Sequence, residues 1–202
     1  LAKLLILERK LPFEDSSGIL VISHTNTAVN EIRNVIGEYC PKLFSYPNFV
    51  GTIQSFVNKY LARQFGTNVI ENRISTVDSD PYKKEIMNKY NKIKWNKNFG
   101  KIASLFWGRN IEKAKKIAKY QDGNKSDICK KLIKQEVENI YFDFNTNSIK
   151  EFKNDEVIIS DSKNKKYIGL KKIIFEVLNS GIISYEYAYK LAFYYLLRFP
   201  KT

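Results

Sequence analysis

Two short stretches of the sequence gather small hydroxyl and amide side chains in a pattern that suits phosphate binding. Residues 23–27 read Ser-His-Thr-Asn-Thr and follow an apolar run, and residues 51–55 read Gly-Thr-Ile-Gln-Ser and follow the apolar pair Phe49-Val50. Each stretch opens a helical pattern, and helix N-termini attract anions with their free N–H groups. Hydroxyl and amide groups also hold a nucleic-acid backbone without reading its bases. Ordinary helix capping would explain one such stretch, but two in succession favour an anion-binding edge.

The surrounding pattern predicts the elements that would position the two stretches. Residues 19–22 are an apolar run expected to form a strand buried on both faces, and a helix is expected from about residue 27 to 38. A second strand is expected at residues 49–52, with a second helix over about 54–65. Strand, polar loop and helix, repeated, is typical of an α/β domain with a parallel sheet. The carboxyl ends of such strands meet at one edge of the sheet, where ligands bind.

The rest of the chain is expected to be mainly helical. Ser126 is expected to cap a helix that runs to about residue 140. A β-hairpin or two short strands are expected over residues 148–168, with residues 157–159 the clearest strand. The other helices are expected at residues 1–11, 80–90, 168–179 and 184–198.

The net charge of +13 is unevenly distributed along the chain. Residues 1–80 hold 8 Lys+Arg and 8 Asp+Glu, whereas residues 81–202 hold 26 and 13, so the whole excess lies in the second part. A domain-sized basic excess favours a polyanion partner, most often nucleic acid. The chain is also rich in Lys, Asn, Ile, Tyr and Phe, a bias that an AT-rich genome would give to any protein, so charge alone decides little.

A densely basic stretch at residues 82–119 also contains Trp95 and Trp107. Lysines and aromatic rings together could follow a nucleic-acid strand and stack on its bases. The simpler interpretation is a solvated basic face over buried tryptophans, so we expect both tryptophans in the core and the lysines on a DNA backbone. These lysines are Lys83, Lys84, Lys89, Lys92, Lys94, Lys97, Lys101, Lys113, Lys115, Lys116 and Lys119.

Hydropathy and cysteine usage set further limits. No apolar run approaches the ~20 residues that span a bilayer, and no signal peptide is visible. Cys40 and Cys129 have neither metal-ligand spacing nor a disulfide framework. We therefore expect two buried thiols in a cytoplasmic protein without a metal site. The sequence has no initiator methionine and its first helical pattern lacks an N-cap, so we also expect a piece of a longer chain.

Four segments resemble, in order and spacing, the UvrD/Rep/PcrA-like superfamily 1 DNA helicases. Residues 19–32, ILVISHTNTAVNEI, resemble motif Ia, an apolar strand followed by T-F-T-N-x-A-A-x-E-M. Residues 50–56, VGTIQSF, resemble the next block, G-T-F-H-S-F. Residues 1–5 resemble the helix after the phosphate-binding Lys-Thr of that family, and residues 179–200 resemble the segment leading into its Asp-Glu strand.

The likeness is incomplete at two positions. His24 stands where the family usually has Phe, and Gln54 where it usually has His. An imidazole could still stack on a base or donate to a phosphate, or it could simply bond to a neighbouring backbone group. The Ser-His-Thr-Asn form also resembles UvrD-like helicases of phage-defence systems of the Gabija type.

The resemblance implies a partial RecA-like parallel-sheet domain with a mainly helical 1B-type insertion that includes a small β-hairpin. Residues 1–74 and 180–202 would belong to domain 1A, and residues 75–179 would form the insertion. The full-length parent would be an ATP-dependent DNA helicase that uses ATP and Mg²⁺. Its partners would be single-stranded DNA, or a junction of single and double strands, and the rest of the helicase chain, with no membrane. Phe56 would be a core residue, and the candidate DNA contacts would be Ser23, His24, Thr25, Asn26, Thr52 and Ser55.

The sequence itself lacks the residues that hydrolyse ATP. It has no G-x-x-x-x-G-K-[ST], and Asp155-Glu156 precedes its apolar run instead of ending it, unlike a Walker B pair. We therefore expect this chain alone to hold no catalytic, cofactor-binding or metal-binding residues and to be inactive. Two alternatives stay open: a non-enzymatic basic nucleic-acid-binding module whose RecA-like half is only scaffold, and a helicase-nuclease subunit of the AddA/RecB kind.

Overall fold

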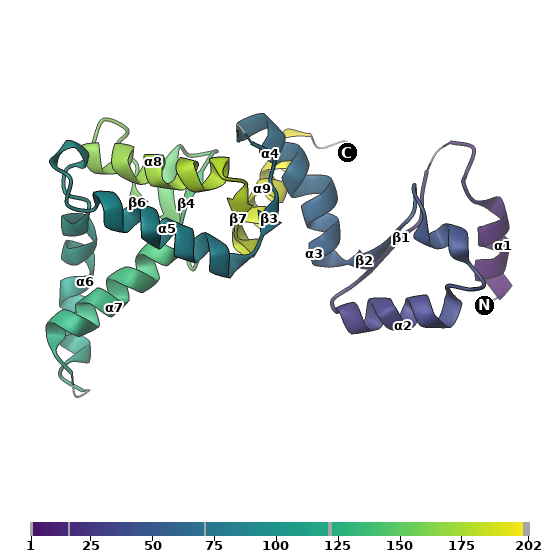
Figure 1. Ribbon diagram of the computed structural model, residues 1–202, viewed down its shortest axis with the longest axis horizontal. Helices are drawn as coiled ribbons and strands as arrows, with labels where there is room; N and C mark the ends of the chain where they lie inside the picture. Colours follow the sequence, from purple (N-terminus) through teal and green to yellow (C-terminus); the bar gives the residue numbers. More distant parts are fainter. Residues whose placement is uncertain (1, 16, 71, 121–122, 200–202) are drawn as a thin grey trace. The chain divides into compact units, whose positions relative to one another are not determined.

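The computed structural model describes residues 2–15, 17–70, 72–120 and 123–199, and the chain forms two compact units, residues 1–62 and 63–202 (Figure 1). The first unit is built around two strands. Its elements are α1 (Ala2–Lys10), β1 (Leu20–Ser23), α2 (Asn26–Ile36), the 3₁₀-helix η1 (Pro41–Phe44), β2 (Phe49–Thr52), α3 (Ile53–Phe56) and the π-helix η2 (Val57–Ala62).

Strands β1 and β2 of the first unit are parallel, with Leu20 opposite Phe49 and Ser23 opposite Thr52. Asn48 fixes the start of the pair, because its Oδ1 accepts a hydrogen bond from the Ile19 N–H at 2.8 Å. The predicted succession of strand, polar loop and helix is therefore confirmed twice. The helix expected over residues 54–65 is instead divided into α3, η2 and α4 (Arg63–Val69).

The prediction that β1 is buried on both faces is wrong. Leu20 is 51% exposed and Ile22 is 46% exposed, whereas Val21 and Ser23, which alternate with them, are half-buried. This alternation arises because successive side chains of a strand point to opposite faces. Helices α2 and α3 and strand β2 contact β1, but they leave Leu20 and Ile22 about half exposed.

The second unit is mainly helical, as expected, and contains two small sheets. The 76–77 and 182–183 segments, β3 and β7, pair in parallel, and β4, β5 and β6 form an antiparallel sheet in that order. Besides α4, its elements are β3 (Thr76–Val77), α5 (Ser79–Ile93), the 3₁₀-helix η3 (Lys97–Phe99), α6 (Ala103–Ile117), α7 (Lys125–Glu138), β4 (Ile140–Asp143), β5 (Ser148–Glu151), β6 (Val157–Ile159), α8 (Lys165–Asn179), β7 (Ile182–Ile183) and α9 (Tyr185–Arg198).

Two sequence predictions for this unit are corrected in detail. Asn124, not Ser126, caps α7, because its side-chain oxygen accepts from the Ser126 N–H at 2.9 Å. The expected hairpin is a three-stranded sheet, since residues 140–143 form an additional strand. The helix was expected to run to about residue 140, but α7 ends at Glu138 and only Asn139 separates it from this strand.

Buried tyrosines join the helices of the second unit to its antiparallel sheet. The Tyr82 hydroxyl of α5 donates to the Ile140 carbonyl at 2.9 Å, and the Tyr187 hydroxyl of α9 donates to the Phe142 carbonyl at 2.9 Å. Both side chains are fully buried. A buried hydroxyl with a partner avoids the desolvation cost of an unpaired one, so these tyrosines add specificity as well as apolar area to the core.

Asp143, at the end of β4, is a buried carboxylate surrounded by donors. It accepts hydrogen bonds from Lys150 Nζ, from the Tyr194 hydroxyl at 2.9 Å and from the Asn145 N–H at 2.9 Å. Burial alone would raise the pKa of Asp143, but the hydrogen bonds from Lys150, Thr146 and Tyr194 outweigh it and lower the pKa to about 2. The group is therefore a charged anchor between β4, β5 and α9.

The two cysteines are buried free thiols, as predicted. Within the described ranges, no helix is long and apolar enough to cross a membrane, and His, Cys, Asp and Glu side chains form no cluster of three or more that could hold a metal ion.

Candidate nucleic-acid interface

The polar loops after β1 and β2 lie side by side. In the parallel register, Ser23 at the end of β1 is opposite Thr52 at the end of β2. The two loops therefore start from neighbouring positions at the carboxyl edge of this sheet, as the sequence pattern predicts. We call residues 23–26, 52 and 55 the loop edge.

Each loop caps its own helix. Thr25 has an extended backbone, and its Oγ1 accepts from the Ala28 N–H at 3.2 Å at the start of α2. Thr52 does the same for α3, since its Oγ1 accepts from the Ser55 N–H at 3.1 Å and lies 2.9 Å from Ser55 Oγ. Capping thus occupies one lone pair of each threonine oxygen and leaves the hydroxyl of Thr25 exposed to solvent.

The six residues of the loop edge differ in exposure. His24, Thr25, Asn26 and Ser55 are exposed, and Ser23 is half-buried. Thr52 is buried, so its hydroxyl acts on Ser55 and not directly on a ligand. The structure therefore offers four exposed polar side chains at this edge, with Thr52 in a positioning role.

An aromatic cluster adjoins the second loop. Phe56 is half-buried, and its ring centroid lies 5.6 Å from that of Phe49 and 5.2 Å from that of Tyr60. The Lys59 ammonium lies 5.0 Å from the Tyr60 ring centroid. Gln54 donates from Nε2 to Asn58 Oδ1 at 3.0 Å, which holds its amide along the helix. The position of Phe56 in this cluster agrees with a packing role.

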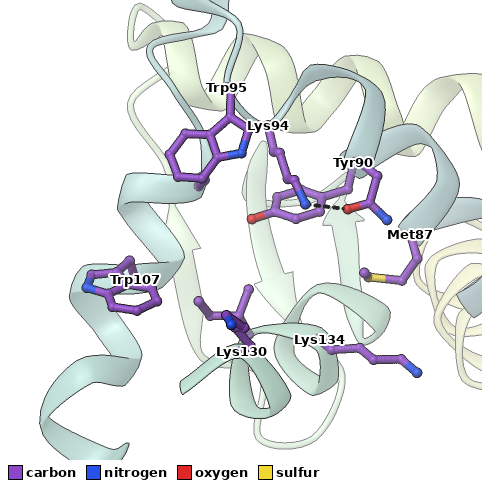
Figure 2. A pocket seen from close by; sticks show the side chains of 10 residues that line it. Met87, Tyr90, Lys94, Trp95, Trp107, Lys130 and Lys134 are labelled. Atoms are coloured by element: carbon purple, nitrogen blue, oxygen red, sulfur yellow. Dashed lines mark hydrogen bonds between the residues drawn. The ribbon is translucent and has the colours of Figure 1, made fainter. Parts of the chain in front are cut away.

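The second unit has a separate pocket of about 270 Å³ between α5, α6 and α7. Figure 2 shows Trp95, Trp107 and Tyr90 around it, with Lys130 and Lys134 on α7. The full lining is Met87, Tyr90, Asn91, Lys94, Trp95, Ala103, Trp107, Lys130, Ile133 and Lys134. We call this site the tryptophan pocket.

The expectation that both tryptophans belong to the core is wrong. Trp95 is 66% exposed and Trp107 is 40% exposed. The buried face of α6 is formed by Phe106, Asn110 and Ala114, which are spaced four residues apart, so Trp107 lies to one side of that face. Trp95 follows the last turn of α5 and precedes η3. Sequence spacing alone does not show which side of α6 meets its neighbours.

The basic stretch at residues 82–119 is largely a solvated face. Most of its lysines are exposed, but Lys89 pairs with Glu176 at 3.2 Å and Lys115 pairs with Glu112. Asp155 and Glu156 are likewise engaged. Asp155 accepts from Lys190 at 2.6 Å and Glu156 from Arg109 at 2.7 Å. The hydrogen bonds from Lys190 and from Tyr141 lower the pKa of Asp155.

The family model of the UvrD/REP helicase N-terminal domain matches residues 3–180. The match includes both polar loops and the tryptophan pocket. Searches of curated proteins and of solved structures gave no match.

Proposed function

Because the chain belongs to the UvrD/REP helicase N-terminal domain family, we propose that it is part of an ATP-dependent DNA helicase and that its loop edge contacts the backbone of single-stranded DNA. The observation that carries the proposal is the register of Ser23 against Thr52, which places two polar helix starts side by side. Exposed hydroxyl, amide and imidazole groups there suit phosphates, which accept hydrogen bonds at any sequence.

Hydrolysis of ATP is proposed only for the full-length parent. ATP bound with Mg²⁺ would supply the energy for movement along DNA, but this chain does not fit that role. Its sequence has no phosphate-binding G-x-x-x-x-G-K-[ST], and its Asp155-Glu156 pair is engaged in ion pairs with Lys190 and Arg109. No catalytic step is therefore assigned to these residues.

The DNA contact is tested with two exposed residues of the loop edge. His24→Ala combined with Asn26→Ala removes two candidate donors without removing either capping threonine. We expect the affinity for a labelled single-stranded oligonucleotide to fall about tenfold, the effect of losing one charge-assisted hydrogen bond. Fluorescence anisotropy at low salt measures it.

The matched control for this experiment is Asn34→Ala, an exposed asparagine on the last turns of α2. It should bind DNA like the unchanged protein.

A second double variant, Asn26→Ala combined with Thr52→Ala, should weaken binding at least as much as His24→Ala combined with Asn26→Ala. It should also lose helix stability, because the Thr52 cap is missing. Unchanged affinity in folded double variants would return the loops to a purely capping role.

The parent gene separates the helicase from its alternatives. A G-x-x-x-x-G-K-T encoded upstream of Leu1 and an apolar strand with Asp-Glu encoded after Thr202 would support it. Their absence would favour a non-enzymatic basic binding module, and a nuclease domain in the same gene would favour a helicase-nuclease subunit.

A further inference from the structure

The tryptophan pocket exposes two indole rings to solvent. Trp95 and Trp107 together leave large parts of two indoles in water, which is unfavourable for apolar surface. Tryptophan is the residue type most enriched at binding hot spots. Tyr90 and Ala103, both buried, also line the pocket.

The pocket is held in shape before any ligand arrives. Tyr90 is anchored edge-on against Phe106, with 5.7 Å between ring centroids. The backbone on either side of Trp95 is hydrogen-bonded, because the Lys94 carbonyl accepts from the Ala103 N–H at 3.0 Å and the Asn96 N–H donates to the Ile93 carbonyl at 2.9 Å. Tyr90 and the backbone around Trp95 are therefore held in place before a ligand binds, which lowers the entropic cost of binding.

The rim of the pocket is cationic. Lys94 donates to Asn91 Oδ1 at 2.7 Å, and its ammonium lies 5.7 Å from the Tyr90 ring centroid. Lys130 pairs with Asp127 at 2.9 Å, and Lys134 approaches Glu138 at 3.7 Å. The Lys130–Asp127 pair is exposed, and such pairs contribute little stability. Little stability would therefore be lost if these lysines left their present partners and bound a phosphate.

A second groove of about 570 Å³ continues from the pocket along α5 and α7 and shares Met87, Asn91 and Lys134 with it. Lys83 and Lys84 add positive charge there, while Asp80 and Glu138 add negative charge. The pocket rim and the groove together therefore hold the lysines Lys83, Lys84, Lys94, Lys130 and Lys134.

We propose that the tryptophan pocket stacks one unpaired base of a DNA strand, with the neighbouring phosphates on Lys94, Lys130 and Lys134. A base has two flat π faces, and stacking on aromatic side chains holds any base. A volume of about 270 Å³ is small among ligand pockets, which span about 300–1,000 Å³, so it suits one ring system better than a peptide helix. The choice of DNA rests on the proposed function, but the site is separate from the loop edge.

The chain provides its own reporter for this site. It contains two tryptophans, and both line the pocket. Base stacking should therefore quench the intrinsic tryptophan fluorescence of the full chain. A short oligothymidylate should quench it, and an abasic oligonucleotide of the same length and charge should bind more weakly and leave the fluorescence nearly unchanged.

Substitutions identify the rings responsible. Trp95→Ala and Trp107→Ala should each lower the affinity for the oligothymidylate about five- to tenfold and reduce its advantage over the abasic strand. Tyr120→Ala is the control, because Tyr120 is an aromatic residue of the same unit that is 88% exposed and does not line the pocket. Circular dichroism verifies that each variant folds.

Three results would overturn the proposal: equal affinity for the base-bearing and abasic strands, absence of quenching at saturating DNA, or an acidic peptide that quenches more strongly than DNA. The last would identify a protein-binding surface. His24→Ala with Asn26→Ala distinguishes the two sites. If this variant binds normally while quenching persists, the loop-edge proposal fails and the stacking site stands.

Discussion

Among single residues, Asp143 has the clearest energetic consequence. Its carboxylate is buried and accepts from Lys150, Tyr194 and backbone N–H groups of the following turn. The charge is stabilised by these donors more than it is destabilised by burial, so the pKa of Asp143 falls to about 2. The carboxylate therefore stabilises the folded state only while it is ionised.

This predicts a loss of stability in acid. The pKa of Asp143 is lower in the folded chain than in the unfolded one, so its contribution is complete above about pH 4 and disappears as the pH falls toward about 2. The contribution is about 2 kcal/mol. Urea unfolding at pH 5 and at pH 2.5 measures the change.

The matched variant for this pH effect is Asp143→Asn, which cannot ionise. It should be less stable than the unchanged protein at pH 5 and should lose less stability on acidification. An identical pH dependence in both proteins would assign the acid sensitivity to other carboxylates.

The sequence predicts the local structure around some residues but not the solvent exposure of others. Helix capping within the two polar stretches could be anticipated, because a cap depends on an N–H group three residues away, and the structure assigns it to Thr25 and Thr52. The exposure of Trp95 and Trp107 could not be predicted, because it depends on which sides of α5, α6 and α7 meet. The same limit applies to Leu20, whose cover depends on elements distant in sequence.

Two glycines on different helices of the second unit should respond in opposite ways to alanine. A Cβ on Gly169 of α8 would lie 2.7 Å from Ile102 Cδ1 and 2.8 Å from Phe99 Cβ, so Gly169→Ala should cost about 1–3 kcal/mol of stability. A Cβ on Gly108 of α6 would meet nothing within 4 Å. Gly108→Ala should therefore add about 0.5–1 kcal/mol, the helix preference of alanine over glycine.

Denaturant midpoints of the two variants check this pair, and each serves as the control for the other. A Gly169→Ala variant as stable as Gly108→Ala would show that α8 is not packed closely against residues 99–102. It would then contradict the helix contacts described for the second unit.

Helices and strands could be predicted where local sequence signals mark their ends. The parallel pair β1 and β2 follows from apolar runs that end in polar residues. The helix expected over residues 80–90 is α5, which extends to Ile93 and is capped by Asp78, whose side chain accepts from the Asp80 N–H at 3.1 Å. Strand β4 was not predicted, because the preceding helix was expected to run to about residue 140 and a short apolar run does not by itself distinguish a strand from a buried helical segment. Antiparallel pairing with β5, across the turn at residues 144–147, decides the conformation of residues 140–143.

Over the whole molecule, positive charge is concentrated in the second unit, since residues 81–202 carry the entire excess. We expect the affinity of the full chain for single-stranded DNA to fall steeply with salt, by a log–log slope of about −0.7 for each phosphate contacted. Lys113→Gln combined with Lys116→Gln, both exposed on α6, should reduce the slope by about 1. Anisotropy titrations at several salt concentrations measure it.

The control for the salt experiment is Lys3→Gln combined with Lys10→Gln, which removes the same charge from α1 in the first unit. Its slope should match that of the unchanged protein. A larger effect in this control than on α6 would place the electrostatic contact in the first unit, and binding that ignores salt would contradict a basic contact altogether.

The short parallel pair of β3 and β7 has a consequence for how the chain could diversify. The Ser75 and Thr76 N–H groups both donate to the Gly181 carbonyl, at 2.9 and 3.0 Å, and the Asp78 N–H donates to the Ile183 carbonyl at 2.9 Å. The chain thus leaves this strand pair after β3 and rejoins it at β7, about a hundred residues later. Because the two ends of the intervening segment lie together, insertions or deletions in its exposed loops can leave the β3–β7 pair unchanged. Its core is nevertheless shared with α9, since Tyr187 and Tyr194 hydrogen-bond to β4.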